Sequence, residues 1–410
     1  MKTPSLLSYG FSHHLFHQAV ELQDRFDRYA VATPSFFSAA TLRRVGRLSR
    51  RLAALLARRS HPRLRAEIVH PFPIEHAYQL SARLFRKDYS YYAAHDRMAR
   101  RIVRRFDPPA AVIAIDTGAE SLFRAWAGRS FRVLDLTIAN APFRSHLFRA
   151  AESAPDAAGV WFHHPGEWEL RRYAAEAELA DLVLCPSEFV MESCRFIGVP
   201  EYRLRLLPYG FDPGRFHAPP TPPDPAGPLR LVFVGTFCTR KGSHLLLPAF
   251  AAVRARTPDA ELHVFGDVQD HPAEPPPGVV FHGRIPQPLL AERLRGMHLM
   301  AFPTLFEGSS YAVYQALASG VPVVTTRNCG SIVDTTCGVV LAEPAVAELT
   351  ATLLALVHDR VRLAALAAGA AERVKHYTWA RYGERLHRIL AEACPALAPF
   401  DRLSRPVQRA

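Results

Sequence analysis

The sequence predicts an α/β protein made of two doubly wound, Rossmann-like halves. Two observations lead to this class. Short apolar runs rich in β-branched residues alternate with longer helical segments, which is typical of parallel sheets covered by helices. A Pro-rich segment at residues 217–228 (HAPPTPPDPAGP) interrupts the alternation and cannot continue a helix or a central strand. We therefore expect one sheet on each side of this segment.

The first half is expected to contain several strands joined by helices. The expected strands are residues 5–9, 29–32, 66–69, 110–115, 132–138 and 182–185. Between them lie helical stretches such as 15–26 and 91–105. Because strands and helices alternate, a parallel arrangement with helical crossovers is predicted.

The second half alternates more regularly, from residue 229 to about residue 378. Its expected strands are 229–235, 260–266, 279–283, 298–303, 321–326 and 338–342, and its expected helices are 243–256, 287–296, 310–319 and 345–358. This order again predicts a parallel, doubly wound sheet.

The most informative segment of the second half is residues 298–326. An apolar run stops at Pro303, a Glu-Gly-Ser-Ser loop follows, and an Ala- and Leu-rich helical stretch leads into the next apolar run. Such a loop leaves the carboxyl edge of a parallel sheet and feeds a helix N-terminus, where free N–H groups and the helix dipole favour an anion such as a diphosphate. Glu307 lies in the loop, and Gln315 lies about 7.5 Å further along the helix if Ser310 caps it. The segment could therefore contact a sugar, a diphosphate and a ribose.

This segment resembles the donor-site signature of the retaining family 4 ("group 1") glycosyltransferases of GT-B fold. In that family a Glu, seven residues and a second Glu precede a small-residue turn. This chain has Glu307, seven residues, Gln315 and then the turn ASGVPVV at 318–324. The turn matches, whereas the second acid is replaced by an amide.

Other segments resemble the family in the same order. They are LVFVG at 231–235, RKG at 240–242, VFGD at 264–267, ADLVLCPS at 180–187, LPYGFD at 207–212 and YTW at 377–379. The similarity runs from about residue 172 to about residue 390. It implies an acceptor-binding domain at 1–212 that is completed by 380–410, a linker at 213–228 and a nucleotide-sugar-binding domain at 229–379. The terminal helix is then expected to cross back onto the first domain.

The resemblance implies transfer of a sugar from a nucleotide-diphospho-sugar to a glycan or lipid-linked acceptor, with retention of anomeric configuration. Negative charge then develops on the departing diphosphate, so electrostatic stabilisation there matters most. No Asp-x-Asp motif follows a strand, so we expect neither a metal nor another cofactor beyond the donor itself.

Two residues are the catalytic candidates. Lys241 is one of only four lysines in an Arg-rich chain, and its place directly before Gly242 suits a compact phosphate-binding ammonium. Glu307 would, as in the family, hold a sugar hydroxyl and add negative charge near the anomeric centre. Alternatively, Lys241 is an exposed residue beside a turn and Glu307 a solvated loop acid.

The donor site is expected to include further residues around these two. They are Gly235, Thr236, Arg240, Gly266, Gly308, Ser309, Ser310, Tyr311 and Gln315. Thr236 stands where the family usually has an Arg, and we expect Arg240 to supply that cation. The N–H groups of Ser310 and Tyr311 would complete the anion site. Gln315 could still bind ribose without charge assistance, or it could be a plain helix-surface residue.

The acceptor side carries weaker signals. Gly10 and His13 lie in the first strand-to-helix turn, His164 lies in a loop, and Asn140 stands where the family often has a His. These four residues are the acceptor-binding candidates.

The net charge of +12 comes almost entirely from Arg, which is concentrated at 43–65. Apolar residues recur there at helical spacing, which predicts a basic amphipathic helix. Such a helix could lie on an anionic membrane, or it could be an ordinary solvated helix packed on the sheet. No zinc-finger, RRM or helix-turn-helix signature supports nucleic-acid binding. With no apolar run of about 20 residues and no signal peptide, we expect a cytoplasmic protein, which could lie on the inner membrane face as a peripheral protein.

Two other functions stay open. Thr236 and Gln315 are compatible with a catalytically silent GT-B protein that binds a sugar nucleotide or glycan as a regulatory or complex subunit. A sugar-nucleotide epimerase or hydrolase, which would transfer to water, is the third possibility.

Overall fold

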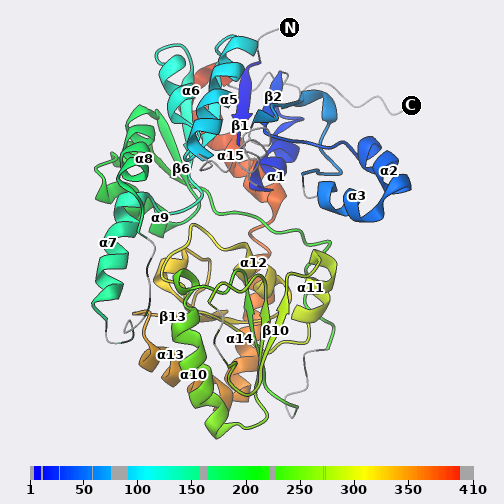
Figure 1. Ribbon diagram of the computed structural model, residues 1–410, viewed down its shortest axis with the longest axis vertical. Coiled ribbons are helices and arrows are strands. Elements are labelled where there is room, and N and C mark those ends of the chain that lie inside the picture. The colour runs from blue at the N-terminus through cyan, green and yellow to red at the C-terminus, as the bar shows by residue number, and fades with distance from the viewer. Residues whose placement is uncertain are drawn as a thin grey trace.

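The computed structural model describes residues 4–10, 13–26, 28–57, 59–74, 91–154, 156, 160, 162, 164–221, 223, 227–270, 272 and 274–397. Within these residues the chain forms two parallel sheets, one above the other, each flanked by helices (Figure 1). The predicted α/β class with two doubly wound sheets is confirmed.

The first sheet has the order β3-β2-β1-β4-β5-β6-β7, and every pairing in it is parallel. Its strands are β1 Leu6–Tyr9, β2 Tyr29–Thr33, β3 Val69–Pro71, β4 Ala111–Ile115, β5 Phe131–Asp135, β6 Leu182–Cys185 and β7 Leu204–Leu206. Its helices are α1 His13–Leu22, α2 Ala39–Leu48, α3 Arg50–Ala57, η1 Ala66–Ile68, α5 Tyr91–Arg105, α6 Glu120–Ala125, α7 Ala141–Glu152, α8 Glu167–Leu179, α9 Glu188–Phe196 and η3 Glu201–Arg203.

The second sheet has the order β10-β9-β8-β11-β12-β13 and is also parallel. Its strands are β8 Arg230–Val234, β9 Glu261–Phe265, β10 Val279–Gly283, β11 Leu299–Phe302, β12 Val323–Thr326 and β13 Gly338–Leu341. Its helices are η4 Thr239–Lys241, α10 Ser243–Arg256, α11 Gln287–Leu294, α12 Tyr311–Ala318, η5 Arg327–Cys329, α13 Val346–His358 and α14 Arg360–Val374, and the chain continues into α15 Trp379–Ala393 and η6 Pro395–Leu397.

Apolar strands place the core in each half. All residues of β1, β4, β6, β11 and β12 are buried, as expected for central strands with helices on both faces. The structure differs from the expected elements at four places. Residues 66–68 form a 3-10 turn before a strand at 69–71, the strand expected at 132–138 ends at Asp135, and β7 and α14 were not expected.

The two sheets meet at their carboxyl edges, and the chain passes between the halves twice, side by side. Phe211 on the first passage pairs with Thr378 on the second, and the Phe211 N–H donates to the carbonyl of Tyr377 at 3.0 Å. After the second passage α15 packs against α1, and the Tyr382 hydroxyl accepts a hydrogen bond from Gln18 at 3.1 Å. The expected return of the terminal helix to the first half is therefore confirmed.

The Arg-rich stretch expected as one helix within 43–65 is instead two helices, α2 and α3, separated at Ser49. The Ser49 hydroxyl accepts from the N–H of Leu52, so it begins a new helix and breaks the continuous one. The two helices pack on each other and project sideways from the first half (Figure 1). None of the helices in the described residues is both long enough and apolar enough to span a membrane.

Candidate functional site

The loop between β11 and α12 is fixed by backbone hydrogen bonds on both sides. The N–H of Leu305 donates to the carbonyl of Arg240 at 2.9 Å, and the N–H of Glu307 donates to the carbonyl of Asn328 at 2.9 Å. The side-chain amide of Asn328 donates back to the carbonyl of Leu305 at 2.9 Å. The loop therefore holds Glu307 at one position, between the loop after β8 and the turn after β12.

Glu307, Arg240 and Lys241 form one ion cluster. The Oε1 atom of Glu307 lies 2.6 Å from Nη1 of Arg240 and 2.9 Å from Nζ of Lys241. Burial alone would raise the pKa of Glu307, but the charges of Arg240 and Lys241 and their hydrogen bonds outweigh it, so the pKa is lowered and the carboxylate stays ionised. The two basic residues, although adjacent in the sequence, thus converge on one carboxylate.

Gly235 makes room for the Lys241 ammonium. Its φ is +133°, and a Cβ built there would lie 3.1 Å from Nζ of Lys241. The ammonium also lies 5.1 Å from the centre of the Phe302 ring, within range of a cation–π contact. Thr236 follows, partly buried, and the backbone of Gly266 packs directly against Gly235. The predicted residues at the ends of β8 and β9 therefore surround Lys241.

The start of α12 offers free backbone donors. Ser310 is the N-cap residue, and within the described part of the chain the N–H groups of Tyr311 and Ala312 donate to no carbonyl or side chain. This agrees with the predicted anion site at this helix start. The hydroxyl of Ser309, in contrast, lies inside the half and contacts the Tyr314 hydroxyl at 2.9 Å, so its side chain does not face a ligand.

Gln315 lies one turn along α12 and is partly exposed. Its amide nitrogen donates to the side-chain oxygen of Gln287, the first residue of α11, at 3.1 Å. This contact fixes which end of the amide remains available to a ligand. Gln287 was not predicted as a site residue, because the residues around it form no recognisable motif.

The loop bearing Glu307 touches the first half directly. A Cβ at Gly308 would overlap the carbonyl of Thr137, which follows β5, so only glycine permits this approach. The Ser187 hydroxyl, which follows β6, donates to the carbonyl of Gly308 at 2.6 Å. The two halves are therefore closed on each other at this loop.

Aromatic contacts extend the same interface. The ring of Phe306 lies between the guanidinium groups of Arg144 and Arg240, at 5.8 and 5.6 Å, and contacts the ring of Phe148 at 5.0 Å. Arg144 comes from the first half and also forms an ion pair with Glu169 at 2.6 Å. Sequence reasoning missed Arg144 and Ser187, because their partners are far away in the sequence.

The side chains of two acceptor-side candidates, Asn140 and His164, contact other residues of the first half. Asn140 is buried and caps α7, accepting from the N–H of Phe143 at 3.1 Å, and its amide donates to the Ser193 carbonyl, so both ends of its side chain have partners within the protein. Its acceptor-binding role stays a prediction. His164 contacts Glu152 at 2.8 Å and the ring of Phe148. Gly10 is buried at the end of β1, and the side chain of His13 lies outside the described residues.

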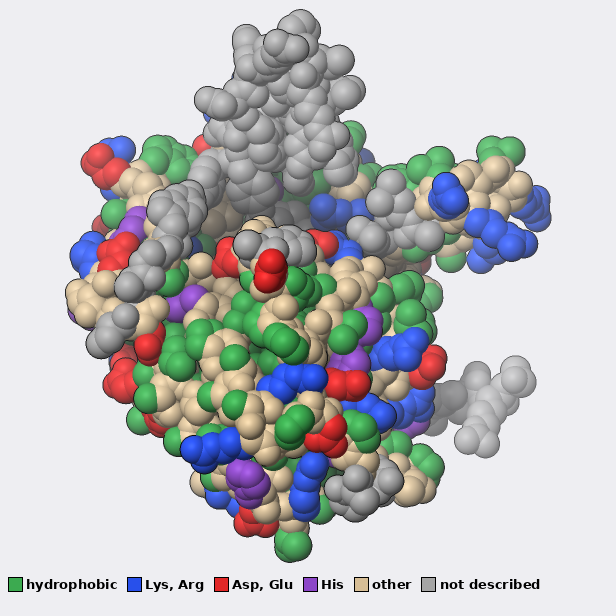
Figure 2. Space-filling model, turned by 60° about the horizontal axis from the view of Figure 1, so that its bottom comes forward, with side chains coloured by type: hydrophobic (Ala, Val, Ile, Leu, Met, Phe, Trp, Pro, Cys, Tyr) green, Lys and Arg blue, Asp and Glu red, His purple; other side chains and the backbone are tan. Residues whose placement is uncertain are grey.

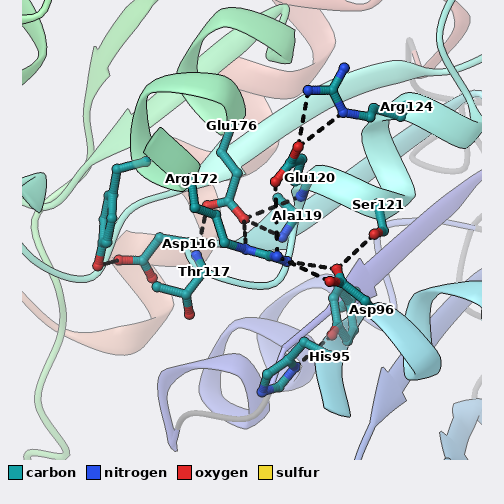
Figure 3. Close-up of polar contacts among 12 residues, drawn as sticks. His95, Asp96, Asp116, Thr117, Ala119, Glu120, Ser121, Arg124, Arg172 and Glu176 are labelled. Carbon is teal, nitrogen blue, oxygen red and sulfur yellow. Dashed lines mark hydrogen bonds and ion pairs between the residues drawn. The ribbon is translucent and has the colours of Figure 1, made fainter. Parts of the chain in front are cut away.

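In the first half the buried carboxylate of Glu176 binds the loop that follows β4 (Figure 3). Glu176 on α8 accepts hydrogen bonds from the N–H groups of Thr117, Ala119 and Glu120 at 2.7 to 3.2 Å and contacts Arg172 at 3.2 Å. Burial raises the pKa of Glu176 to about 7, against the lowering effect of Arg172. Arg172 also pairs with Asp96, which accepts from the Ser121 hydroxyl at 2.6 Å.

Comparisons with known proteins agree with this architecture. Residues 228–359 match the family described as Glycosyl transferases group 1. Over 257 residues the chain is 27% identical to a GDP-mannose-dependent monoacylated alpha-(1-6)-phosphatidylinositol monomannoside mannosyltransferase of Corynebacterium glutamicum, a match covering 56% of this chain and 66% of the relative. It is 29% identical over 181 residues to a D-inositol 3-phosphate glycosyltransferase of Corynebacterium kroppenstedtii, covering 40% of each chain. The chain thus spans less than two thirds of these relatives.

Solved structures resemble nearly the whole chain. A sucrose-phosphate synthase from Thermosynechococcus elongatus superposes with a TM-score of 0.64 at 14% identity, over 96% of this chain and 100% of the other. HepE of Anabaena, solved in complex with UDP, superposes with a TM-score of 0.63 at 15% identity, over 95% and 100%. The fold is therefore GT-B, and residues 228–359 form a group 1 glycosyltransferase domain.

Proposed function

We propose that this protein is a glycosyltransferase that moves a sugar from a nucleotide-diphospho-sugar to a glycan or lipid-linked acceptor with retention of configuration. The observation that carries the proposal is the cluster of Glu307, Arg240 and Lys241 beside the open start of α12. Two cations and free helix N–H groups suit the diphosphate, and an adjacent ionised carboxylate suits a sugar hydroxyl.

In this mechanism the leaving diphosphate draws Lys241 and Arg240 away from Glu307. The positive charge stabilises the departing phosphate oxygens, while the released Glu307 carboxylate binds a sugar hydroxyl and adds negative charge near an oxocarbenium-like centre. These charges are provided by the chain itself, so the proposed reaction needs no resident metal or other cofactor. Gln315, held by Gln287, is proposed to contact the ribose.

A thermal-shift panel of UDP-, GDP- and ADP-sugars tests the donor class. A ligand at about 100 times its dissociation constant adds about 2.7 kcal/mol to the stability of the folded state, so one nucleotide should stand out clearly. The anomeric configuration of the product, determined by NMR, then tests retention. A panel in which no sugar nucleotide raises the melting temperature would contradict the proposal.

Thr236 and the neutral Gln315 favour a second candidate, a catalytically silent protein that binds a sugar nucleotide or glycan. It predicts a melting shift without any turnover. Release of free sugar from the donor in the absence of an acceptor would instead indicate the epimerase or hydrolase reaction. Incubation of the stabilising donor with the protein, followed by product analysis, separates the three.

We further propose that the α2–α3 hairpin contacts an anionic membrane. Residues 39–57 carry five exposed arginines and no acidic residue, and Leu48 is 90% and Leu52 46% exposed. In Figure 2 the basic side chains gather on the projection at the upper right, with apolar side chains between them. This combination suits a surface of anionic lipid, the site of a lipid-linked acceptor.

Vesicle sedimentation tests this contact. Each basic residue near an anionic surface contributes about 1 kcal/mol, so replacing Arg43, Arg47, Arg50 and Arg51 by Gln should abolish binding to anionic vesicles. The melting temperature should hardly change, because exposed charges add little to stability. Absence of sedimentation in the parent protein, or sedimentation unaffected by the four changes or by salt, would reduce the hairpin to a solvated projection.

A further inference from the structure

Two tyrosines whose hydroxyl groups are buried lie where the two halves join. Tyr209 is on the first passage between the halves, and Tyr311 is the first residue of α12. Their rings stack with centres 5.0 Å apart and planes 16° apart. Among the described residues, neither hydroxyl has a hydrogen-bond partner, and Tyr209 is 4% exposed. An unpaired buried hydroxyl destabilises the folded state, so a pair of them requires a reason.

Other buried tyrosines of the described chain are paired. Tyr29 donates to Ser8 at 2.8 Å, Tyr173 donates to Asp116 at 3.1 Å, and Tyr382 accepts from Gln18 at 3.1 Å. Tyr9 contacts His95 and Tyr314 contacts Ser309. The fold therefore pairs its tyrosine hydroxyls elsewhere and leaves these two without a partner.

The carboxylate of Asp135 is connected to Tyr209 through His14, which contacts both. The ring of His14 is 5.2 Å from that of Tyr209, and Nε2 of His14 lies 2.9 Å from Oδ2 of Asp135. Gln18 donates to the same oxygen at 3.0 Å, whereas Oδ1 of Asp135 receives no hydrogen bond from the described residues. Burial, neighbouring tyrosines and the charge of Asp135 raise the pKa of both Tyr209 and Tyr311, so both remain protonated donors at neutral pH.

We propose that Tyr209, Tyr311 and Asp135 together bind one hydroxyl group of a sugar or related polyol. This inference rests on the proposed function and adds a hydroxyl-binding site beside the diphosphate site. A polyol hydroxyl can accept from a phenol and donate to Oδ1 of Asp135, so it satisfies both kinds of group. A phosphate would accept from the phenols but be repelled by Asp135, so the cluster favours a hydroxyl over an anion.

Both phenol hydroxyls are covered in this closed arrangement. The ligand therefore reaches them when the halves separate about the paired passages at residues 207–212 and 377–379, on the first of which Tyr209 lies. Closure then replaces water around the phenols with the ligand hydroxyl. The hydroxyl can belong to the donor sugar or to the acceptor, and the experiment below distinguishes the two.

The test uses Tyr209→Phe, Tyr311→Phe and the double variant, with Tyr29→Phe as the matched control. Removing a hydroxyl that has no partner should leave the melting temperature of the ligand-free protein unchanged or raise it, whereas Tyr29→Phe removes a paired hydroxyl and should lower it. Each site variant should weaken one ligand about tenfold, the effect of one hydrogen bond. The control should bind every ligand as the parent does.

The ligands are UDP, GDP, UDP-glucose, GDP-mannose, methyl α-mannoside and myo-inositol, titrated by calorimetry. A tenfold loss for the sugar nucleotides, with the free nucleotides unchanged, assigns the hydroxyl to the donor sugar. A tenfold loss for methyl α-mannoside or myo-inositol, with the sugar nucleotides unchanged, assigns it to the acceptor. Either result supports the proposal.

A lower melting temperature in the ligand-free site variants would overturn the inference, because it would mean that ordered water or the protein already satisfies the hydroxyls. Unchanged affinity for all six ligands would overturn it as well. If no nucleotide or sugar nucleotide binds the parent protein, the proposed function fails. The melting temperatures and the two polyols still decide the hydroxyl site in that case.

Discussion

The loops after β4 and after β11 occupy equivalent places in the two sheets. The helices that follow them differ, however, in whether a carboxylate of the protein binds the N–H groups at the helix start. Each strand lies at the point where the strand order reverses, and each loop leads into a helix. After β4, the carboxylate of Glu176 fills the helix start and accepts three backbone N–H bonds. After β11, the helix start is left open, and the local carboxylate Glu307 is turned toward Arg240 and Lys241.

At the start of α6 the anion is Glu176, a part of the protein itself, whereas at the start of α12 we propose that an anion from outside binds. In the first half the chain supplies its own anion from α8, and Thr117 is held there at a φ of +67°, which is uncommon for a residue other than glycine. In the second half cations and helix N–H groups remain available for an anion from outside. The same topology therefore holds an internal carboxylate at the helix start in one half and leaves the helix start uncapped by a side chain in the other.

The largest effect on stability is expected from removing the carboxylate of Glu176 from the start of α6. Glu176→Ala leaves the N–H groups of Thr117, Ala119 and Glu120 without their acceptor and removes one of the acidic partners of Arg172, and should lower the free energy of unfolding by about 3 to 5 kcal/mol. Urea unfolding measures this loss. Glu348→Ala is the control, because Glu348 also accepts two N–H bonds at 2.9 Å, but at an exposed position. This substitution should lower the free energy of unfolding by about 1 kcal/mol. Equal losses in both variants would mean that burial of Glu176 adds nothing.

In the second half, removing a cation should affect turnover. Lys241→Ala removes the contact that we propose to the departing diphosphate, which is expected to cost about 3 kcal/mol of transition-state stabilisation, or about a hundredfold in rate. Steady-state kinetics and donor titration measure it. Lys375→Ala removes an exposed lysine paired with Glu372 and should leave both unchanged. A Lys241 variant with full donor affinity and turnover would place the anion site elsewhere.

The two glutamates should respond to pH in opposite directions. Burial raises the pKa of Glu176 to about 7, so the folded state holds a proton that the unfolded state releases above about 4.5, and stability falls as pH rises through this window. For Glu307, burial is outweighed by Arg240 and Lys241 and the pKa is lowered, so its contribution to stability is present above 4.5 and is lost as pH falls through the lowered pKa.

Urea unfolding at pH 5 and pH 7.5 measures the first of these responses. Glu176 should account for a fall on the order of 2 kcal/mol, since one pKa unit corresponds to about 1.36 kcal/mol. Glu176→Gln should remove that part of the pH dependence. If parent and variant show the same difference between pH 5 and 7.5, Glu176 is ionised throughout.

The smallest effect concerns the ribose. Gln315→Glu restores a charged acceptor on α12 and should tighten binding of nucleoside diphosphate by about 1 kcal/mol in calorimetry. Gln287→Glu, which places the same charge on its hydrogen-bond partner, should give no such gain. Unchanged or weaker binding by the Gln315 variant would mean that this face of α12 does not contact the ribose.

Short-range sequence patterns predicted the sheets and the surroundings of Lys241. The apolar runs located nearly all strands, and the RKG segment, with Arg240 and Lys241 beside Glu307, lies where the resemblance indicated. The roles of these residues stay predictions. The helix-capping role of Asn140 was missed, although Asn followed by Ala and Pro is itself a helix-start pattern, with the proline in the first turn.

The contacts that join distant segments could not be predicted. Glu176 is 59 residues from Thr117, and Ser187 is 121 residues from Gly308. Neither Glu176 nor Ser187 interrupts a periodic pattern of apolar residues. Nothing in the neighbouring residues therefore indicates a partner so distant in the sequence. The three-residue edge strand β7 was missed for a related reason, because so short a run has no measurable alternation.

The position of α15 has a consequence for how the protein emerges from the ribosome. The second sheet and its helices come from one continuous stretch, 230–374, which is complete before the end of synthesis. The first half is synthesised first but lacks its last helix until residue 393 has been added. The hydrogen bond from Gln18 to Tyr382 can form only after a further 364 residues have been synthesised. We therefore expect the later-made half to finish folding first during translation, with the earlier half closing only after residue 393 has left the ribosome.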